Sequence, residues 1–239
     1  NKYIPAMTNK PHYRPYASAL QGQIQQIQHR SAVLEGNPWN DPIDRVLTVY
    51  LPPDYSPESG PYPVLWDLAA YTNSGLGHVN WRNHGENLPQ RLDRLITSGA
   101  MPAAIGVFPD CYTSLGGNQY VNSPAIGNYA SYLTQELYPL INEKFATTPG
   151  PDGHALFGKS SGGYGAIYLA CHHPGYWGAI AAHAPDVGFD RVYLPDFPGT
   201  CSTLAPFAKD LKQFVKTFWS RKQPKGHEFH AMMVLCLAC

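Results

Sequence analysis

One short stretch of the sequence has the residues and spacing of a nucleophilic serine site. It reads Gly158-Lys159-Ser160-Ser161-Gly162 and fits the pattern G-x-S-x-G. In that pattern the serine lies on a sharp turn between a strand and a helix, where larger neighbouring side chains would collide. The glycine spacing favours Ser160 over Ser161 as the nucleophile. We therefore predict acyl transfer at Ser160; the competing interpretation is a turn that only connects two elements.

Attack of a serine on a carbonyl group creates an oxyanion that needs hydrogen-bond donors. The backbone N–H of Ser161 is the first candidate, because it lies at the N-terminal end of the predicted helix. A second donor is expected from the loop after an earlier strand. Small residues surround Tyr71 in that loop, residues 69–75, so we predict its N–H as the second donor. The alternative is an ordinary glycine- and serine-containing turn.

The acid and the histidine that activate such a serine are expected after it in the chain, the acid first. His227 and His230 come late enough, and several acids precede them: Asp186, Asp190, Asp196 and Asp210. These histidines belong to a segment with the pattern of a cap helix, however. We therefore expect the acid and the histidine to lie beyond Cys239. The alternative is a chain without a full triad, which would lose several orders of magnitude in rate.

Other roles for the histidines have weaker support. His172 and His173 end the helix after the serine, where a cation stabilises the helix dipole. His183 follows a predicted strand but precedes nearly every candidate acid. As zinc ligands, His227 and His230 lack a third ligand at a convincing spacing. We predict no metal and no organic cofactor.

Short apolar runs alternate with helical patterns through the middle of the chain. The runs span residues 64–68, 103–108, 154–157 and 179–182, and the helical patterns span residues 88–98, 129–145 and 164–172. Buried strands that alternate with helices indicate βαβ units in a mostly parallel sheet. Sites in such sheets lie at the carboxyl ends of strands, which here are Leu68, Phe108, Phe157 and Ala182.

The two ends of the chain have other patterns. Residues 1–22 are predicted to form an irregular arm, and residues 24–34 and 45–51 an antiparallel hairpin at one sheet edge, with 24–34 half-buried. Residues 186–204 read as a loop, 207–219 as a helix and 228–239 as a further helix of a cap. We predict one domain, residues 1–239, in which residues 186–239 are a cap-like insertion and the last sheet strands lie beyond Cys239.

Composition argues against several functions. The 17 basic and 17 acidic side chains cancel, which disfavours nucleic acid and anionic membrane as partners and suits a small, weakly charged ligand. The longest apolar run, residues 231–239, is about half of the roughly 20 residues that cross a membrane. Five scattered cysteines fit a reducing compartment, so we expect a cytoplasmic protein. A homo-oligomer is compatible with these observations.

Ordered blocks between residues 45 and 185 resemble the putative-esterase branch of the α/β hydrolases. They read VYLPPDY (49–55), YPVL (62–65), FPD (108–110), ELYP (136–139), GKSSGG (158–163) and HP (173–174). This branch includes S-formylglutathione hydrolases, feruloyl esterases, enterobactin esterases and mycolyltransferases. The resemblance implies an α/β-hydrolase fold and a Ser–His–Asp triad, with Ser160 as nucleophile and Tyr71 and Ser161 at the oxyanion positions. Relatives often carry His-Gly or Ser-Gly where this chain has two alanines, residues 69–70.

The sequence therefore favours a serine esterase that hydrolyses a small carboxylic ester through an acyl-enzyme on Ser160. One alternative is transfer of the acyl group to an alcohol other than water, which shares every step up to deacylation. A second is a catalytically dead binding protein with the same fold. The cap and the loop of residues 111–124, which is rich in tyrosine, glycine and asparagine, would shape the substrate pocket.

Overall fold

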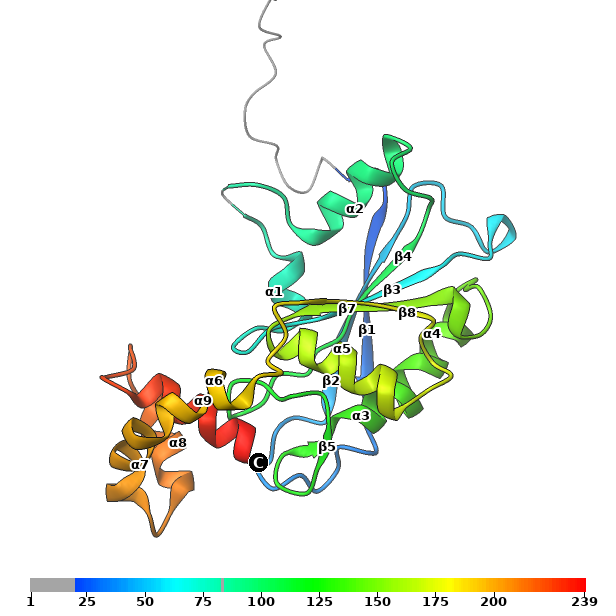
Figure 1. Cartoon of the computed structure of the whole chain (residues 1–239). Helices are drawn as coiled ribbons and strands as arrows, with labels where there is room; N and C mark the ends of the chain where they lie inside the picture. The colour runs from blue at the N-terminus through cyan, green and yellow to red at the C-terminus, as the bar shows by residue number, and fades with distance from the viewer. Residues whose placement is uncertain (1–19, 83) are drawn as a thin grey trace, which may run out of the picture.

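The computed structural model describes residues 20–82 and 84–239, so most of the predicted N-terminal arm lies outside the described residues (Figure 1). Six strands form one sheet in the order β1-β2-β4-β3-β7-β8. They are β1 (Gln23–Arg30), β2 (Asp44–Leu51), β3 (Val64–Leu68), β4 (Ile105–Phe108), β7 (His154–Lys159) and β8 (Ala179–His183). A small separate hairpin is formed by β5 (Asn122–Ser123) and β6 (Gly127–Asn128).

The pairing confirms a mostly parallel sheet with an antiparallel N-terminal edge. Strand β3 pairs in parallel with β4 and β7, and β7 pairs in parallel with β8. Strand β2 is antiparallel to both β1 and β4. The parallel strands consequently end at a common edge, which brings the loops after β3, β4, β7 and β8 together.

Helices cover both faces of this sheet (Figure 1). On one face lie α1 (Gly75–Val79) and α2 (Leu88–Thr97), and the ring of Phe108 packs with Tyr50 and Leu92 there. On the other lie α5 (Ser161–His172) and a long helix of three parts, α3 (Tyr129–Ser131), η3 (Tyr132–Leu137, a π-helical turn) and α4 (Tyr138–Lys144). Short 3₁₀ turns occur at η2 (Pro57–Ser59) and η4 (Pro151–Gly153).

Two predicted elements near the sheet differ from the structure. The first predicted strand, residues 24–34, ends at Arg30, and it is largely exposed rather than half-buried, with Ile24 38% exposed. Its alternating pattern belongs to an edge strand that has a neighbour on one side only. The helix after Ser160 begins at Ser161 rather than Tyr164, because Gly162 and Gly163 pack against the strands as part of its first turn.

The predicted loop of residues 186–204 is wrong, because most of it is helical. It contains α6 (Phe189–Val192), η5 (Leu194–Asp196) and α7 (Phe197–Leu204). Pro195 and Pro198 occupy the first positions of η5 and α7, where a proline sacrifices no helical hydrogen bond. Beyond them come η6 (Ala205–Phe207), α8 (Leu211–Trp219) and α9 (Glu228–Ala238). We call residues 186–239 the cap segment; much of it projects to one side of the sheet (Figure 1).

None of the helices in the described part of the chain combines the length and the apolar character that a membrane crossing requires.

Candidate active site

Ser160 stands on the turn between β7 and α5, as the sequence predicted. Its backbone has φ 55° and ψ −120°, a conformation that residues with a Cβ seldom adopt. Its N–H donates to the carbonyl of His183 at 3.1 Å, which ties the turn to the end of β8. A Cβ on Gly162 would lie 2.0 Å from the carbonyl oxygen of Leu68, so the close approach of α5 to β3 requires glycine there.

A carboxylate, not a histidine, contacts the hydroxyl of Ser160. Ser160 Oγ donates to Asp186 Oδ1 at 2.9 Å, and Ser161 Oγ donates to Asp186 Oδ2 at 3.1 Å. The hydroxyl of Tyr193 also donates to Oδ2, at 2.9 Å, and accepts a hydrogen bond from Gln119. Burial and the hydrogen bond to Asp186 raise the pKa of Tyr193, which keeps its hydroxyl protonated as a donor. Both serines are therefore held by one buried acid.

The two predicted oxyanion donors lie on neighbouring elements. Ser161 is the first residue of α5, so its N–H has no acceptor within the helix. In the loop after β3, Thr72 donates to the Gly116 carbonyl at 2.7 Å and Asn73 to the Ala70 carbonyl at 3.0 Å. The N–H of Tyr71, which lies between Ala70 and Thr72 in the sequence, has no acceptor in the described ranges. The N–H groups of Ser161 and Tyr71 are therefore both available as donors.

The loop with Tyr71 rests against residues 110–118, which we call the 110–118 loop. The hydroxyl of Tyr71 donates to the Leu115 carbonyl at 2.9 Å. A Cβ on Gly116, where φ is 89°, would come within 3.0 Å of the Tyr71 hydroxyl oxygen. The backbone of Gly116 thus lies so close to the side chain of Tyr71 that a residue with a Cβ would be crowded at position 116.

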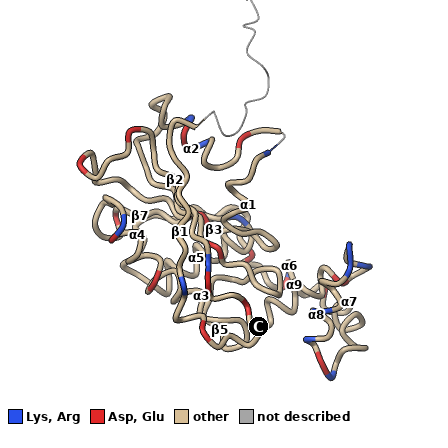
Figure 2. Tube along the Cα trace, turned by 180° about the vertical axis from the view of Figure 1, so that it is seen from behind, with Lys and Arg blue, Asp and Glu red and all other residues tan. Residues whose placement is uncertain are grey.

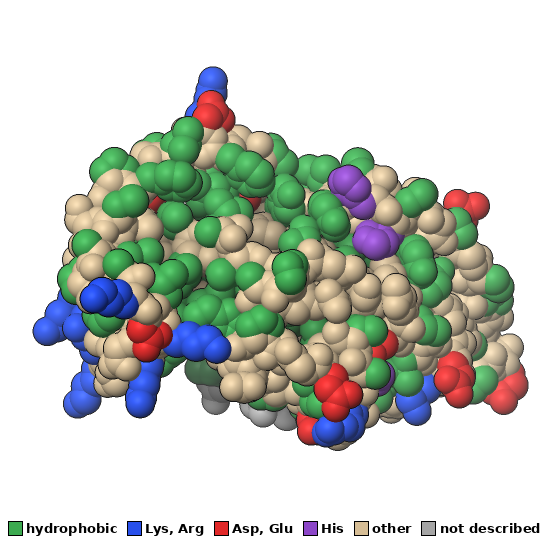
Figure 3. Space-filling model, turned by 90° about the horizontal axis from the view of Figure 1, so that it is seen from below, with side chains coloured by type: hydrophobic (Ala, Val, Ile, Leu, Met, Phe, Trp, Pro, Cys, Tyr) green, Lys and Arg blue, Asp and Glu red, His purple; other side chains and the backbone are tan. Residues whose placement is uncertain are grey.

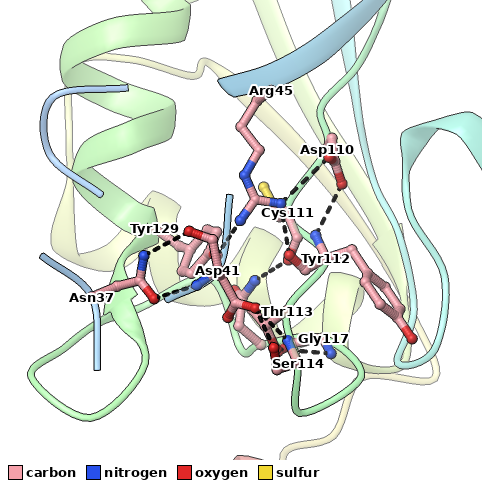
Figure 4. A network of polar contacts seen from close by, with 11 residues as sticks. Asn37, Asp41, Arg45, Asp110, Cys111, Tyr112, Thr113, Ser114, Gly117 and Tyr129 are labelled. Carbon is pink, nitrogen blue, oxygen red and sulfur yellow. Dashed lines mark hydrogen bonds and ion pairs between the residues drawn. The ribbon is translucent and has the colours of Figure 1, made fainter. Parts of the chain in front are cut away.

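Buried polar groups fix the 110–118 loop in turn (Figure 4). Arg45 is 3% exposed, and its guanidinium donates to the Tyr112 carbonyl at 2.7 Å and to the Tyr129 hydroxyl at 2.9 Å. It also pairs with Asp110 at 3.4 Å. At the other end, the backbone N–H and hydroxyl of Ser114 both donate to Asp41 Oδ1. The loop is held by directional bonds from β2 and the segment before it.

A second buried acid lies directly beneath the Tyr71 loop. Asp67 on β3 contacts Nδ1 of His78 on α1, and its side chain is 4% exposed. Burial raises the pKa of Asp67, and the hydrogen bond from His78 opposes that rise. The pair joins the strand before the Tyr71 loop to the helix after it. Sequence analysis did not single out this pair, although Asp67 is the one polar residue of an otherwise apolar strand.

The structure does not bring the predicted histidines to Ser160. The ring of His227 lies against Gly199, where a Cβ would be 3.1 Å from it, and it is 6.1 Å from the ring of His230. His172 stacks on Tyr168 with ring centroids 4.4 Å apart. Within the described residues no histidine hydrogen-bonds to Ser160 Oγ, and no cluster of three or more His, Cys, Asp or Glu side chains could hold a metal.

Asp186 is the residue whose position sequence reasoning missed. It was considered as one of four acid partners for a late histidine, not as a direct partner of Ser160 and Ser161. A signal was present, since Asp186 follows the carboxyl end of a predicted parallel strand by a few residues.

Several known proteins are similar to this chain in sequence. The family model described as putative esterase matches residues 43–231. An uncharacterized protein of Bacillus subtilis, YbbA, is 29% identical over 202 residues, which are 77% of each chain. S-formylglutathione hydrolase of Mus musculus is 30% identical over 147 residues, 58% of this chain and 51% of that enzyme. The chain thus spans about half the length of this curated hydrolase.

Solved structures reproduce the fold. A ferulic acid esterase superposes with a TM-score of 0.54 at 24% identity, and an S-formylglutathione hydrolase from Agrobacterium tumefaciens with 0.52 at 23%. Each comparison covers 70% of this chain and 60% of the other. Because the family model covers most of the chain, this chain belongs to the putative esterase family, and it has the α/β-hydrolase fold of these solved structures.

Proposed function

We propose that this protein is a carboxylic-ester hydrolase in which Ser160 forms an acyl-enzyme. The observation that carries the proposal is the conformation of Ser160, with φ 55° on a turn packed between β3, β7 and β8. Such a conformation costs about 1–3 kcal/mol and persists where the surrounding structure enforces it. Family membership supports ester hydrolysis, and the strained backbone of Ser160 supports this residue as the nucleophile.

In the proposed reaction Ser160 Oγ attacks the carbonyl carbon of the ester. Its proton passes to a base and then to the departing alkoxide as the ester C–O bond breaks, and water later cleaves the acyl-enzyme. The N–H groups of Ser161 and Tyr71 donate to the oxyanion. Asp186, which accepts the hydrogen bond from Ser160, is a positioning residue in this proposal, because it holds the hydroxyls of both Ser160 and Ser161.

The base in this proposal is a histidine, oriented by an acid, from sequence beyond Cys239. Two observations support it. In the described ranges Ser160 Oγ bonds to Asp186 rather than to a ring nitrogen. Strand β8 ends the described sheet, and its residues are largely exposed, with Ile180 42% exposed. Further strands at this edge would place their terminal loops beside Ser160.

Covalent labelling with a fluorophosphonate, read by intact mass, tests the nucleophile. We expect one label per chain on a protein with an activated serine, loss of the label in Ser160→Ala, and its retention in Ser161→Ala. Ser161→Ala is a matched control, because it removes a hydroxyl that bonds to the same carboxylate of Asp186 and leaves the backbone N–H at this position in place. Labelling of Ser160→Ala would overturn the assignment. Labelling of a longer protein but not of residues 1–239 would support a base beyond Cys239.

We also propose a cellular compartment for the protein and an acceptor for the acyl group. The five cysteines are free thiols, which supports a reducing, cytoplasmic location. We propose water as the acceptor, and product analysis with a competing alcohol distinguishes hydrolysis from acyl transfer.

A further inference from the structure

A cavity of about 300 Å³ lies between the Tyr71 loop and the cap segment. Aromatic rings line several of its sides, among them Tyr71, Tyr112, Trp219 and Phe229. Two cations, Arg221 and Lys222, also belong to the lining, and no carboxylate side chain of the described residues does. Its volume lies at the lower end of the range for small-molecule sites, so one substituted ring system fits.

The rings are fixed at angles to one another. Phe229 meets Tyr71 edge-on, with centroids 5.8 Å apart, and Trp219 meets Phe218 edge-on at 5.0 Å. The indole N–H of Trp219 donates to the Ser114 carbonyl at 2.6 Å, which anchors it to the 110–118 loop. Trp219 is nevertheless 48% exposed and Phe229 38%. Fixed rings with free surface are suited to contact a flat apolar ligand.

The charge around this cavity is positive, although the whole chain is balanced. Residues 209–228 contain six Lys or Arg and two Asp or Glu, whereas the chain has 17 of each kind. Figure 3 shows Lys and Arg side chains gathered at the cap end of the molecule, and Figure 2 shows the same excess from behind. Arg221 is paired with Glu228. Lys222 is exposed and has no partner in the described ranges, so its charge is available to a ligand.

The cavity adjoins the proposed reaction centre through Tyr71. A Cβ on Gly162, two residues after Ser160, would lie 3.0 Å from the carbonyl oxygen of Ala69. Ala69 precedes Tyr71 by two residues, a reach of at most about 7–8 Å along the chain. A ligand in the cavity therefore contacts Tyr71, the residue whose N–H is one proposed oxyanion donor.

We propose that this cavity binds the part of the ester that is remote from the reacting carbonyl, and that this part is an aromatic ring bearing an anionic group. Trp219 and Phe229 contact the ring, and Lys222 pairs with the anion. This inference rests on the proposed function and specifies its substrate class. It differs from the expectation of a weakly charged ligand, because the zero net charge of the sequence conceals a local excess of cations.

Binding of two matched, unreactive probes tests the inference. Naphthoate and naphthamide share the ring and differ in charge, and calorimetric titration of the Ser160→Ala protein with each avoids turnover. We expect naphthoate to bind about tenfold more tightly at low salt, the effect of one accessible ion pair. Lys222→Gln should remove most of this difference, whereas Lys209→Gln, which lies outside the cavity lining, should preserve it. Trp219→Ala should weaken both probes.

Charge reversal provides a second arm. Lys222→Glu should make naphthamide the tighter ligand, and its thermal midpoint should match that of Lys222→Gln because the side chain is exposed. Equal affinity for both probes, or an unchanged difference in Lys222→Gln, would overturn the inference. Selective naphthoate binding together with a fluorophosphonate label that persists in Ser160→Ala would leave the cavity assigned and refute the nucleophile. A label lost in Ser160→Ala without selective binding would support the nucleophile and refute the cavity assignment.

Discussion

The two walls of the candidate site are held by different forces. The 110–118 loop is fixed by hydrogen bonds and an ion pair from Arg45 and Asp41, both of them buried (Figure 4). The cap segment packs through apolar side chains on α8 and α9, such as Phe214, Met232 and Leu235. Polar contacts with the sheet domain are made mainly at the start of the cap segment, where Asp186 bonds to Ser160 and Ser161 and Tyr193 to Gln119. Around α8 they come from exposed residues, from Trp219 to Ser114 and from Lys212 to Pro38.

This difference matches what each wall must do. In the proposed reaction the N–H of Tyr71 donates to an oxyanion, and a donor loses this effect when its direction changes, so the proposal requires a rigid support for the Tyr71 loop. Apolar packing tolerates small displacements, because dispersion and burial do not depend on angle as hydrogen bonds do. The cap segment can therefore adjust around a ligand while the reaction side remains fixed. Four predictions test this contrast.

Removal of the buried cation should have the largest effect. Arg45→Met removes the buried guanidinium with its bonds to the Tyr112 carbonyl and the Tyr129 hydroxyl and leaves the half-buried Asp110 without its charge partner, so we expect a loss of about 3–5 kcal/mol in the free energy of unfolding. Arg30→Met is the matched control, since the Arg30–Asp44 pair is exposed by 65% and 70% and should contribute at most about 1 kcal/mol. Urea denaturation measures both. Similar losses in the two variants would contradict the conclusion that buried polar contacts hold the 110–118 loop in place.

Truncation in α9 should loosen the cap without affecting the opposite wall. Met232 is 1% exposed, so Met232→Ala should cost about 2–5 kcal/mol. Hydrogen exchange should show lost protection in residues 186–239 and unchanged protection in residues 110–118. Met233→Ala, at a half-buried neighbouring position, should have a smaller effect. Equal loss of protection in both walls would mean that they unfold as one unit.

The sheet beneath both walls should respond to acid through His154. Burial lowers the pKa of His154 to about 4, and its Nδ1 accepts a hydrogen bond from the indole of Trp66 at 3.0 Å. The unfolded chain takes up this proton near pH 6.5, well before the folded one. The contribution of His154 to stability is therefore complete above about pH 6.5 and falls towards pH 4, by up to about 1.4 kcal/mol per unit. Denaturation of wild type and His154→Gln across this range should show the slope in wild type only.

The smallest effect should come from one hydroxyl. Tyr71→Phe keeps the backbone N–H and removes the bond to the Leu115 carbonyl, at a cost of about 0.5–1.5 kcal/mol. We expect the rate of fluorophosphonate labelling to fall severalfold, because the donor loop loses its support from the 110–118 loop. Tyr168→Phe, on the outer part of α5, should label at the wild-type rate. An unchanged rate in Tyr71→Phe would show that this bond does not position the donor.

The sheet domain was largely predictable because its signals are local. Apolar runs with helical patterns between them gave β3, β4 and β7 within a few residues, and the glycines around Ser160 located the elbow. The errors lie where tertiary context decides. An edge strand such as β1 has the alternation of a half-buried one, and prolines at helix starts made residues 186–204 resemble a loop.

The candidate site was predictable only in part. Ser160, Ser161 and Tyr71 follow from a motif and its expected partner loop. The contact of Asp186 with both serines depends on where the chain turns after β8, and the cavity joins Tyr71 to residues about 150 positions later. The net charge of zero does not indicate the cations around the cavity, because a sum over the whole chain does not describe the charge of one part of its surface.

The backbone of Ser160 has a consequence for the stability of this chain. At φ 55° a glycine would be the more comfortable residue, so a change from Ser160 to glycine would make the fold more stable. In the proposed function this turn is therefore a place where stability is given up for the reactivity of one hydroxyl. Ser160→Gly should unfold at a higher urea concentration than the wild type and take up no fluorophosphonate label.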